Sequence, residues 1–192
     1  MSKKNVVIVG IIAFALIGFG FILGGKDSTD NSTSIQQRTS TAAPAEKGAT
    51  KTGVQKGQLA PDFALTTIEG KTVSLSQFRG DPVIVSFVQT VGCAPCAIEA
   101  QNIRKAQDSA TLKVIQVGIA PERPEDLLYF RQAVGRPEWL MGLDRNLGIA
   151  KQYNVRNIDA TVMVDKEGKI IYRDEGQPAE TDAILAALGE AS

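Results

Sequence analysis

The segment 83–96 reads VIVSFVQTVGCAPC, and it decides the fold. Its first six residues form an apolar run that predicts a fully buried strand. Cys93 and Cys96 are the only two cysteines of the chain, and they lie where this strand turns into a helix predicted from about Pro95 to Asp108. Two cysteines separated by two residues at a strand-to-helix junction are typical of a thiol–disulfide exchange centre.

The composition argues against several other uses of two cysteines. A structural zinc site needs four Cys or His ligands, whereas the chain has two Cys and no His. Ala97 follows Cys96, so the pair is not a haem attachment sequence. A purely structural disulfide stays open, although so short a loop removes little entropy from the unfolded chain. The 21 basic and 21 acidic residues give a formal charge of zero, which does not indicate a nucleic-acid partner.

An apolar segment near the N-terminus, residues 6–23, contains no charged residue. As a helix it would span roughly 27 Å, enough to cross a bilayer. Lys3 and Lys4 precede it, so the positive-inside rule places this end in the cytoplasm and the rest of the chain outside. A cleaved signal peptide is the alternative, but its apolar core is usually shorter, about 7 to 15 residues. We therefore expect a single-pass transmembrane anchor over residues 1–25 and an extracytoplasmic location.

The remainder divides into a linker and one domain. Residues 26–57 are rich in Ser, Thr, Gln, Lys, Gly and Ala, which predicts a flexible polar linker. Residues 58–192 suit a single domain in which strands alternate with helices. Beyond the segment already quoted, the pattern predicts a hairpin at 63–66 and 72–75, a strand at 112–118, helices at 124–134, 146–153 and 181–188, and a second hairpin at 161–164 and 169–172. The expected class is an α/β sandwich with a central mixed sheet flanked by helices.

Further motifs follow in a fixed order along this domain. They are APDF at 60–63, GKTVSLSQFRG at 70–80, Glu99 three residues after Cys96, and YNV at 153–155 leading to VDKEGKI at 164–170. In this order and spacing they resemble the membrane-anchored thioredoxin-like proteins of the TlpA and ResA type, within the wider redoxin group. The resemblance spans essentially the whole folded part. It implies a thioredoxin-like fold and an enzyme, a thiol–disulfide oxidoreductase that acts on protein thiols or disulfides.

The roles of the site residues follow partly from position. A helix that begins near Cys93 would stabilise a thiolate there, so we expect Cys93 to be the exposed nucleophile and Cys96 to resolve the mixed disulfide. The resemblance implies a disulfide reductase supplied by a membrane-embedded electron donor. Cytochrome c maturation, rescue of oxidised surface proteins and sensing are all compatible with a tethered dithiol. It also implies proton transfer by Glu99, for which the alternative is a solvated helix residue. No cofactor beyond the dithiol is expected.

Two residues near the dithiol depart from the family pattern. Gly92 replaces a Trp, and Asp159 stands before Ala160 where the family has a cis proline. A cis bond before another residue costs about 3 kcal/mol, so we expect the substrate loop at Asp159 and Ala160 to be reshaped. A carboxylate beside Cys93 would raise the pKa of its thiol. The alternative is that Asp159 points into solvent.

Two other functions remain open. A peroxiredoxin-like thiol peroxidase is suggested by Thr90, three residues before Cys93, although Ser86 replaces the expected proline. Its activating arginine would be one of four candidates, Arg123, Arg131, Arg136 and Arg145. A Cu(I) carrier could use both cysteines, with Asp159 as an oxygen ligand, although related carriers space their cysteines three apart and add a His.

Overall fold

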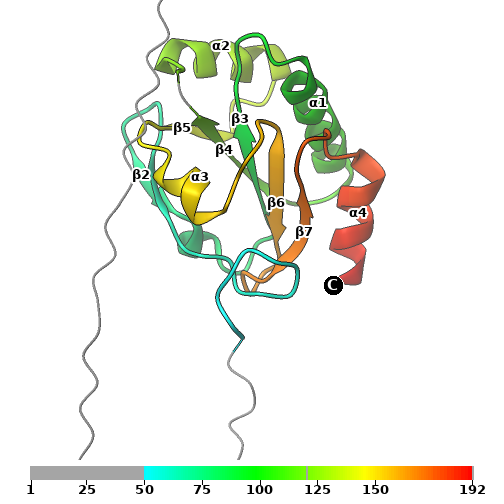
Figure 1. Cartoon of the computed structure of the whole chain (residues 1–192). Coiled ribbons are helices and arrows are strands. Elements are labelled where there is room, and N and C mark those ends of the chain that lie inside the picture. Colours follow the sequence, from blue (N-terminus) through cyan, green and yellow to red (C-terminus); the bar gives the residue numbers. More distant parts are fainter. Residues whose placement is uncertain (1–49, 120, 192) are drawn as a thin grey trace, which may run out of the picture. The chain divides into compact units, whose positions relative to one another are not determined.

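The fold is built on a mixed central sheet, as predicted, and this sheet has five strands (Figure 1). The computed structural model describes residues 50–119 and 121–191. The strands stand in the order β5-β4-β3-β6-β7, with β3 at the centre. They are β3 (Val83–Val88), β4 (Lys113–Ile119), β5 (Leu140–Asp144), β6 (Ala160–Val164) and β7 (Ile170–Asp174). The first three run parallel, and β6 is antiparallel to both β3 and β7.

Each face of the sheet has its own apolar core. The helices α1 (Ala94–Ser109), α2 (Pro124–Val134) and α4 (Thr181–Glu190) cover one face. The hairpin of β1 (Ala64–Thr66) and β2 (Thr72–Ser74), the short helix η1 (Leu75–Phe78) and α3 (Gly148–Gln152) cover the other. This is the layered α/β arrangement that the alternating pattern predicted.

The central strand β3 alternates between these two cores because successive side chains of a strand point to opposite faces. Val85 and Phe87 pack toward the hairpin and α3. Ile84 packs toward α1, and Ser86 points the same way. The apolar run therefore carries one polar side chain, Ser86, into the helix-covered core, directly beneath the helix that bears the dithiol.

Strand β5 and the short helix η1 are absent from the sequence prediction. Trp139, just before β5, is fully buried and donates its Nε1–H to Gln107 Oε1 at 2.7 Å. Gly142 in the middle of β5 lies against the hairpin: a Cβ there would come within 2.4 Å of the backbone oxygen of Thr66. A strand of five residues with a central glycine has weak strand propensity, so tertiary packing decides it.

The motifs that carried the family resemblance outside the dithiol hold the fold together. Asp62 accepts hydrogen bonds from the backbone N–H and the hydroxyl of Ser76, at 2.9 and 2.7 Å, and so fixes η1. Tyr153 donates its hydroxyl to the backbone oxygen of Pro61 at 2.6 Å. Its ring packs edge-on against Phe63. These residues explain the fold, not the reaction.

The folded part of the chain starts earlier than the predicted boundary at Gln58. Leu59 donates its N–H to the backbone oxygen of Lys51, and Gly57 donates to that of Ile170 at 2.7 Å. Composition alone does not reveal backbone hydrogen bonds of this kind, so it places residues from about 51 to 57 in the linker. The predicted anchor and most of the predicted linker lie outside the described residues. Within those residues, no helix is long and apolar enough to cross a membrane.

Candidate active site

The dithiol lies at the N-terminus of α1, where β3 ends. Cys93 is the N-cap residue of the helix and is disulfide-bonded to Cys96. Its Sγ accepts a hydrogen bond from the backbone N–H of Cys96 at 3.1 Å. A helix N-terminus presents unpaired amides and a positive dipole end, which favour a thiolate at this sulfur once the bond is reduced.

The two cysteines differ less in solvent exposure than expected. Cys93 is 7% exposed and Cys96 is fully buried, and both pack with Val88. The expectation of an exposed nucleophile is wrong for this oxidised form, because the disulfide holds the Cys93 sulfur back against Cys96 and β3. Cys93 is nevertheless the more accessible of the two residues, which suits it to meet a substrate first.

Gly92, directly before the nucleophile, has a left-handed backbone with φ of 77°. A side chain there would meet no neighbour within 4 Å, so space is not the reason for glycine. The reason is the backbone, because residues with a Cβ pay roughly 1 kcal/mol or more in this conformation. A Trp at this position would have to adopt the same unfavourable backbone conformation.

Glu99 lies one turn beyond Cys96 and is fully buried. Ser86 donates its hydroxyl to Glu99 Oε1 at 2.6 Å, and the backbone N–H of Ala179 donates to Oε2 at 3.4 Å. Burial raises the pKa of Glu99 to about 7, although these donors favour the charged form. The alternative of a solvated helix residue is wrong. A buried carboxyl group that titrates near neutral pH can accept or release a proton beside the dithiol.

Asp159 is buried at the start of β6, so the alternative that it points into solvent is also wrong. Its φ is 72° and its N–H donates to the backbone oxygen of Phe87 at 3.0 Å. A proline would fit neither this φ nor this hydrogen bond. Ala160, the other predicted loop residue, is fully buried and pairs with Phe87 in the sheet.

The carboxyl group of Asp159 acts on Glu99. Burial raises the pKa of Asp159, opposed by the backbone N–H of Gly176, and the charges of Asp174 and Glu175 raise it further. The charge of Asp159 in turn contributes to the raised pKa of Glu99. The two acids are thus electrostatically coupled, one on the substrate loop and one behind the dithiol.

The loop before Gly92 is held by a residue that the sequence analysis did not single out. Glu122, in the connection from β4 to α2, accepts hydrogen bonds from the backbone N–H and hydroxyl of Thr90 and from the N–H of Val91. It is 32 residues from Thr90 in the chain and belongs to no short motif, so only the fold brings it here.

The candidate arginines of a peroxidase are mostly engaged elsewhere. In the part of the chain that the structure describes, Arg123 pairs with Asp126, Arg131 pairs with Glu69, and Arg136 pairs with Asp108. Arg145 follows β5, which stands two strands away from β3. The structure therefore brings none of the three paired guanidinium groups to the dithiol as a free cation.

Three exposed apolar side chains belong to segments that lead to or follow the predicted site residues. Val91, directly before Gly92, is 58% exposed, and Ile158, directly before Asp159, is also exposed. Ile98 is exposed on α1 within two turns of Cys93. Exposed apolar side chains next to a reactive group are a common basis for contacts with another protein.

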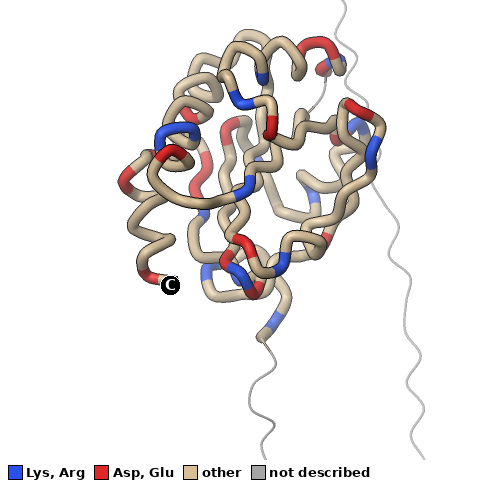
Figure 2. Tube along the Cα trace, turned by 180° about the vertical axis from the view of Figure 1, so that it is seen from behind, with Lys and Arg blue, Asp and Glu red and all other residues tan. Residues whose placement is uncertain are grey.

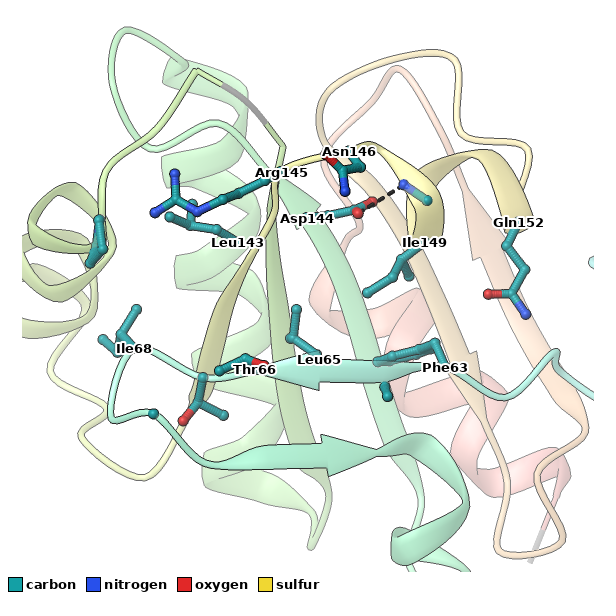
Figure 3. A pocket seen from close by; sticks show the side chains of 15 residues that line it. Phe63, Leu65, Thr66, Ile68, Leu143, Asp144, Arg145, Asn146, Ile149 and Gln152 are labelled. Carbon is teal, nitrogen blue, oxygen red and sulfur yellow. Dashed lines mark hydrogen bonds between the residues drawn. The ribbon is translucent and has the colours of Figure 1, made fainter.

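A pocket of about 690 Å³ lies between the β1–β2 hairpin and the start of α3 (Figure 3). Asp144 at its wall accepts the backbone N–H groups of Gly148 and Ala150, each at 2.8 Å. Its carboxylate is thus occupied in holding α3. Neither cysteine lines this pocket.

The charges of the described fold are dispersed. Figure 2 shows acidic and basic positions interspersed along the chain, in keeping with its formal charge of zero. Within the same residues, no group of three or more His, Cys, Asp or Glu side chains is placed to hold a metal ion.

Comparison with known proteins gives the family. Residues 55–188 match the Redoxin family, which covers the dithiol and the complete sheet. The chain belongs to the redoxin family. This redoxin is an oxidoreductase, and the predicted resemblance to thiol–disulfide oxidoreductases is confirmed.

Relatives of this redoxin fall into two groups. It is 28% identical over 123 residues to the thiol-disulfide oxidoreductase ResA of Bacillus thuringiensis, covering 63% of the chain and 70% of ResA. It is 32% identical over 151 residues to the chloroplastic peroxiredoxin Q of Populus jackii, covering 70% of each chain. Among solved structures, a thioredoxin-like protein from Aeropyrum pernix shares 25% identity with a TM-score of 0.60, over 67% of this chain and 89% of that one.

Proposed function

We propose that this redoxin is a membrane-tethered extracytoplasmic thiol–disulfide oxidoreductase that reduces disulfides of protein substrates through Cys93 and Cys96. One observation carries the proposal. A cysteine pair caps a helix N-terminus while a buried carboxyl group with a pKa of about 7, Glu99, lies one turn behind the second cysteine.

The reaction starts from the reduced dithiol. The Cys93 thiolate attacks one sulfur of the substrate disulfide, so that the substrate S–S bond breaks and a bond between Cys93 and that sulfur forms. The other substrate sulfur leaves as a thiolate and takes a proton from solvent. The exposed apolar side chain of Val91, two residues before Cys93, suits contact with a protein substrate.

The second step releases the substrate. The Cys96 thiol gives its proton to Glu99 and attacks the Cys93 sulfur, and the remaining substrate sulfur leaves as a thiol after protonation. Two electrons pass from the dithiol to the substrate, and the Cys93–Cys96 disulfide of this structure is the product state. A dithiol of the membrane-embedded donor restores the reduced form by the same exchange in reverse.

The proposed location rests on the sequence. The uncharged apolar segment 6–23 is long enough for a bilayer, and Lys3 and Lys4 favour a cytoplasmic N-terminus. Disulfides form and persist outside the cytoplasm, so a reductase there depends on a continuous supply of electrons. Labelling intact cells with a membrane-impermeant thiol reagent after mild reduction tests this: labelled Cys93 supports the location, and labelling only after lysis contradicts it.

Trapping the mixed disulfide tests the reaction. The Cys96→Ser variant of the full chain should accumulate a covalent adduct with a disulfide-bonded substrate, because the resolving sulfur is absent. The Cys93→Ser variant should form none. Adducts of equal yield through Cys96 alone would overturn the assigned order.

A thiol peroxidase is the second candidate, favoured by the similarity to peroxiredoxin Q and by the spacing of Thr90 and Cys93. The Thr90 hydroxyl donates its proton to Glu122 Oε1 at 2.8 Å, so it has none to offer a thiolate at Cys93. This contact argues for exchange over peroxide reduction. If the reduced chain consumes hydrogen peroxide as fast as it reduces disulfides, peroxide reduction becomes the favoured function.

A further inference from the structure

Glu122 connects two loops at the same edge of the sheet. The parallel strands β3 and β4 end side by side there, one leading to the dithiol and the other to α2 (Figure 1). Glu122 is 7% exposed, and its Oε1 is the atom on which the N–H of Thr90, the hydroxyl of Thr90 at 2.8 Å and the N–H of Val91 at 3.3 Å converge.

These three donors belong to the segment that places the nucleophile. Only Gly92, with its left-handed backbone, separates Val91 from Cys93. A further side-chain contact of this segment is the bond from Gln89 Nε2 to the backbone oxygen of Val91 at 3.0 Å. Donors that lose their acceptor in a partly buried place either shift toward water or stay buried without a partner, which destabilises that arrangement. A displacement of the Thr90 and Val91 backbone would also displace Cys93, because only Gly92 lies between them.

We propose that Glu122 is a positioning residue for thiol–disulfide exchange: by accepting all three hydrogen bonds it fixes the loop that carries Cys93 and presents the exposed Val91 beside it. The inference rests on the proposed function. Within residues 50–119 and 121–191, the hydrogen bonds of Glu122 go to Thr90 and Val91 and none goes to a sulfur, so Glu122 acts through these two residues. Misplacement of a reacting atom by about 1 Å can slow a reaction by roughly 100-fold.

Substitutions at Glu122 can separate the effect of its side-chain length from the effect of its negative charge. The other acids around the dithiol are Glu99 behind it and Asp159 on the substrate loop, while Arg123 pairs with Asp126. Glu122→Gln keeps the reach of an oxygen acceptor and removes the charge. Glu122→Asp keeps the charge and shortens the side chain by one methylene. Glu125→Asp and Glu125→Ala are matched controls, because Glu125 is exposed in the first turn of the neighbouring helix α2.

The experiment compares these variants and Glu122→Ala in the full chain. Two quantities are measured: the rate at which the reduced dithiol cleaves an aromatic disulfide reagent, and the hydrogen exchange of the Thr90 and Val91 amides. We expect Glu122→Asp and Glu122→Ala to react about 10-fold more slowly or worse and to lose protection at both amides. Glu122→Gln should recover most of the rate and the protection, and the Glu125 variants should match the wild type.

The results separate the two proposals. Glu122→Asp with the rate and amide protection of the wild type, or Glu122→Gln as slow as Glu122→Ala, would overturn the positioning role. A wild-type chain that cleaves no disulfide would overturn the proposed function and the inference with it. Loss of rate in Glu122→Asp with the rest of the fold still protected from exchange shows a local effect and not general unfolding.

Discussion

Glu99 decides the chemistry at the scale of single residues. Its side chain is fully buried, yet Ser86 and the Ala179 amide offer it hydrogen bonds, and the balance leaves its pKa near 7. A carboxyl group that is half ionised at neutral pH is matched to moving a proton to or from a thiol. The sequence position alone left open whether this residue was solvated.

Glu99→Gln should remove a pH dependence from the resolving step. In the wild type the release of substrate from the mixed disulfide should speed up as pH rises through about 7, because ionised Glu99 accepts the Cys96 proton. The variant should be roughly 100-fold slower at pH 7 and speed up only near the ordinary thiol pKa of about 8.5. Stopped-flow measurement of release from pH 5 to 9 checks this; an unchanged midpoint in the variant would exclude Glu99 as the base.

Asp159→Asn should shift the same pH dependence downward. The charge of Asp159 contributes to the raised pKa of Glu99, so its removal lets Glu99 ionise at lower pH. We expect the midpoint of substrate release to fall below 7 and the pKa of the Cys93 thiol to fall with it. Asp182→Asn, at an exposed position in the first turn of α4, is the control. A midpoint that stays where it is would show that Asp159 does not act on the site.

The asparagine variant is chosen because proline is unsuitable. The left-handed φ of Asp159 and its hydrogen bond to Phe87 both exclude a proline ring, so a proline variant would rebuild the loop as well as remove the charge. The sequence singled out Asp159 as a loop residue, because it occupies the usual proline place. It did not predict the burial of this carboxyl group, which depends on the segment around Gly176.

At the scale of elements, Gly142 fixes how the hairpin lies on β5. The backbone of Thr66 approaches so closely that a Cβ at Gly142 would lie 2.4 Å from its oxygen. Thr67 pairs with Gly142, and Ile68 donates its N–H to the backbone oxygen of Met141 at 2.8 Å. The closeness of the two backbones therefore depends on the missing side chain.

Gly142→Ala should destabilise the fold by about 1 to 3 kcal/mol, because the hairpin or β5 must move apart. Gly189→Ala is the control: Gly189 lies in α4 with nothing within 4 Å of a new Cβ, so alanine there should be neutral or stabilise by up to about 1 kcal/mol. Urea unfolding of both variants measures the difference. Equal stabilities would mean that the hairpin yields to the extra methyl group at no cost.

The elements with strong local patterns were predictable, and those set by long-range contacts were not. The buried run of β3, the helix bounds of α2 and the turn between β6 and β7 follow from periodicity, Pro124 and Gly168. Strand β5 was not predicted, because its central glycine is explained only by the packing of a hairpin that is distant in the sequence. The contact of Glu122 with the dithiol loop was not predicted for the same reason. Its partner Thr90 is 32 residues away in the chain, and an isolated Glu belongs to no motif.

At the scale of the whole molecule, the buried Glu99 makes stability depend on pH. Its pKa rises from 4.5 to about 7 on folding, so between these values the folded state binds more protons than the unfolded state. Stability is therefore highest below pH 4.5 as far as this group is concerned, and it is lost as pH rises through 7. Asp62, Glu69 and Glu175 have lowered pKa values and act in the opposite sense at lower pH.

The free energy of unfolding should thus fall by on the order of 2 to 3 kcal/mol between pH 5 and pH 8. Glu99→Gln should remove most of this fall, because the neutral amide does not titrate. Urea titrations at several pH values, with both proteins in the oxidised state, measure it. The same fall in both proteins would mean that Glu99 is solvated or that its pKa is ordinary.

The reduction potential of the Cys93–Cys96 pair tests the proposed reductase most directly. The full chain is equilibrated in buffers of defined dithiol and disulfide ratio, and the free thiols are counted after alkylation. A reductase predicts a potential near that of thioredoxin, about −270 mV, so that electrons pass readily to substrate disulfides. A value near about −120 mV would make the pair an oxidant and would contradict the proposed direction of exchange.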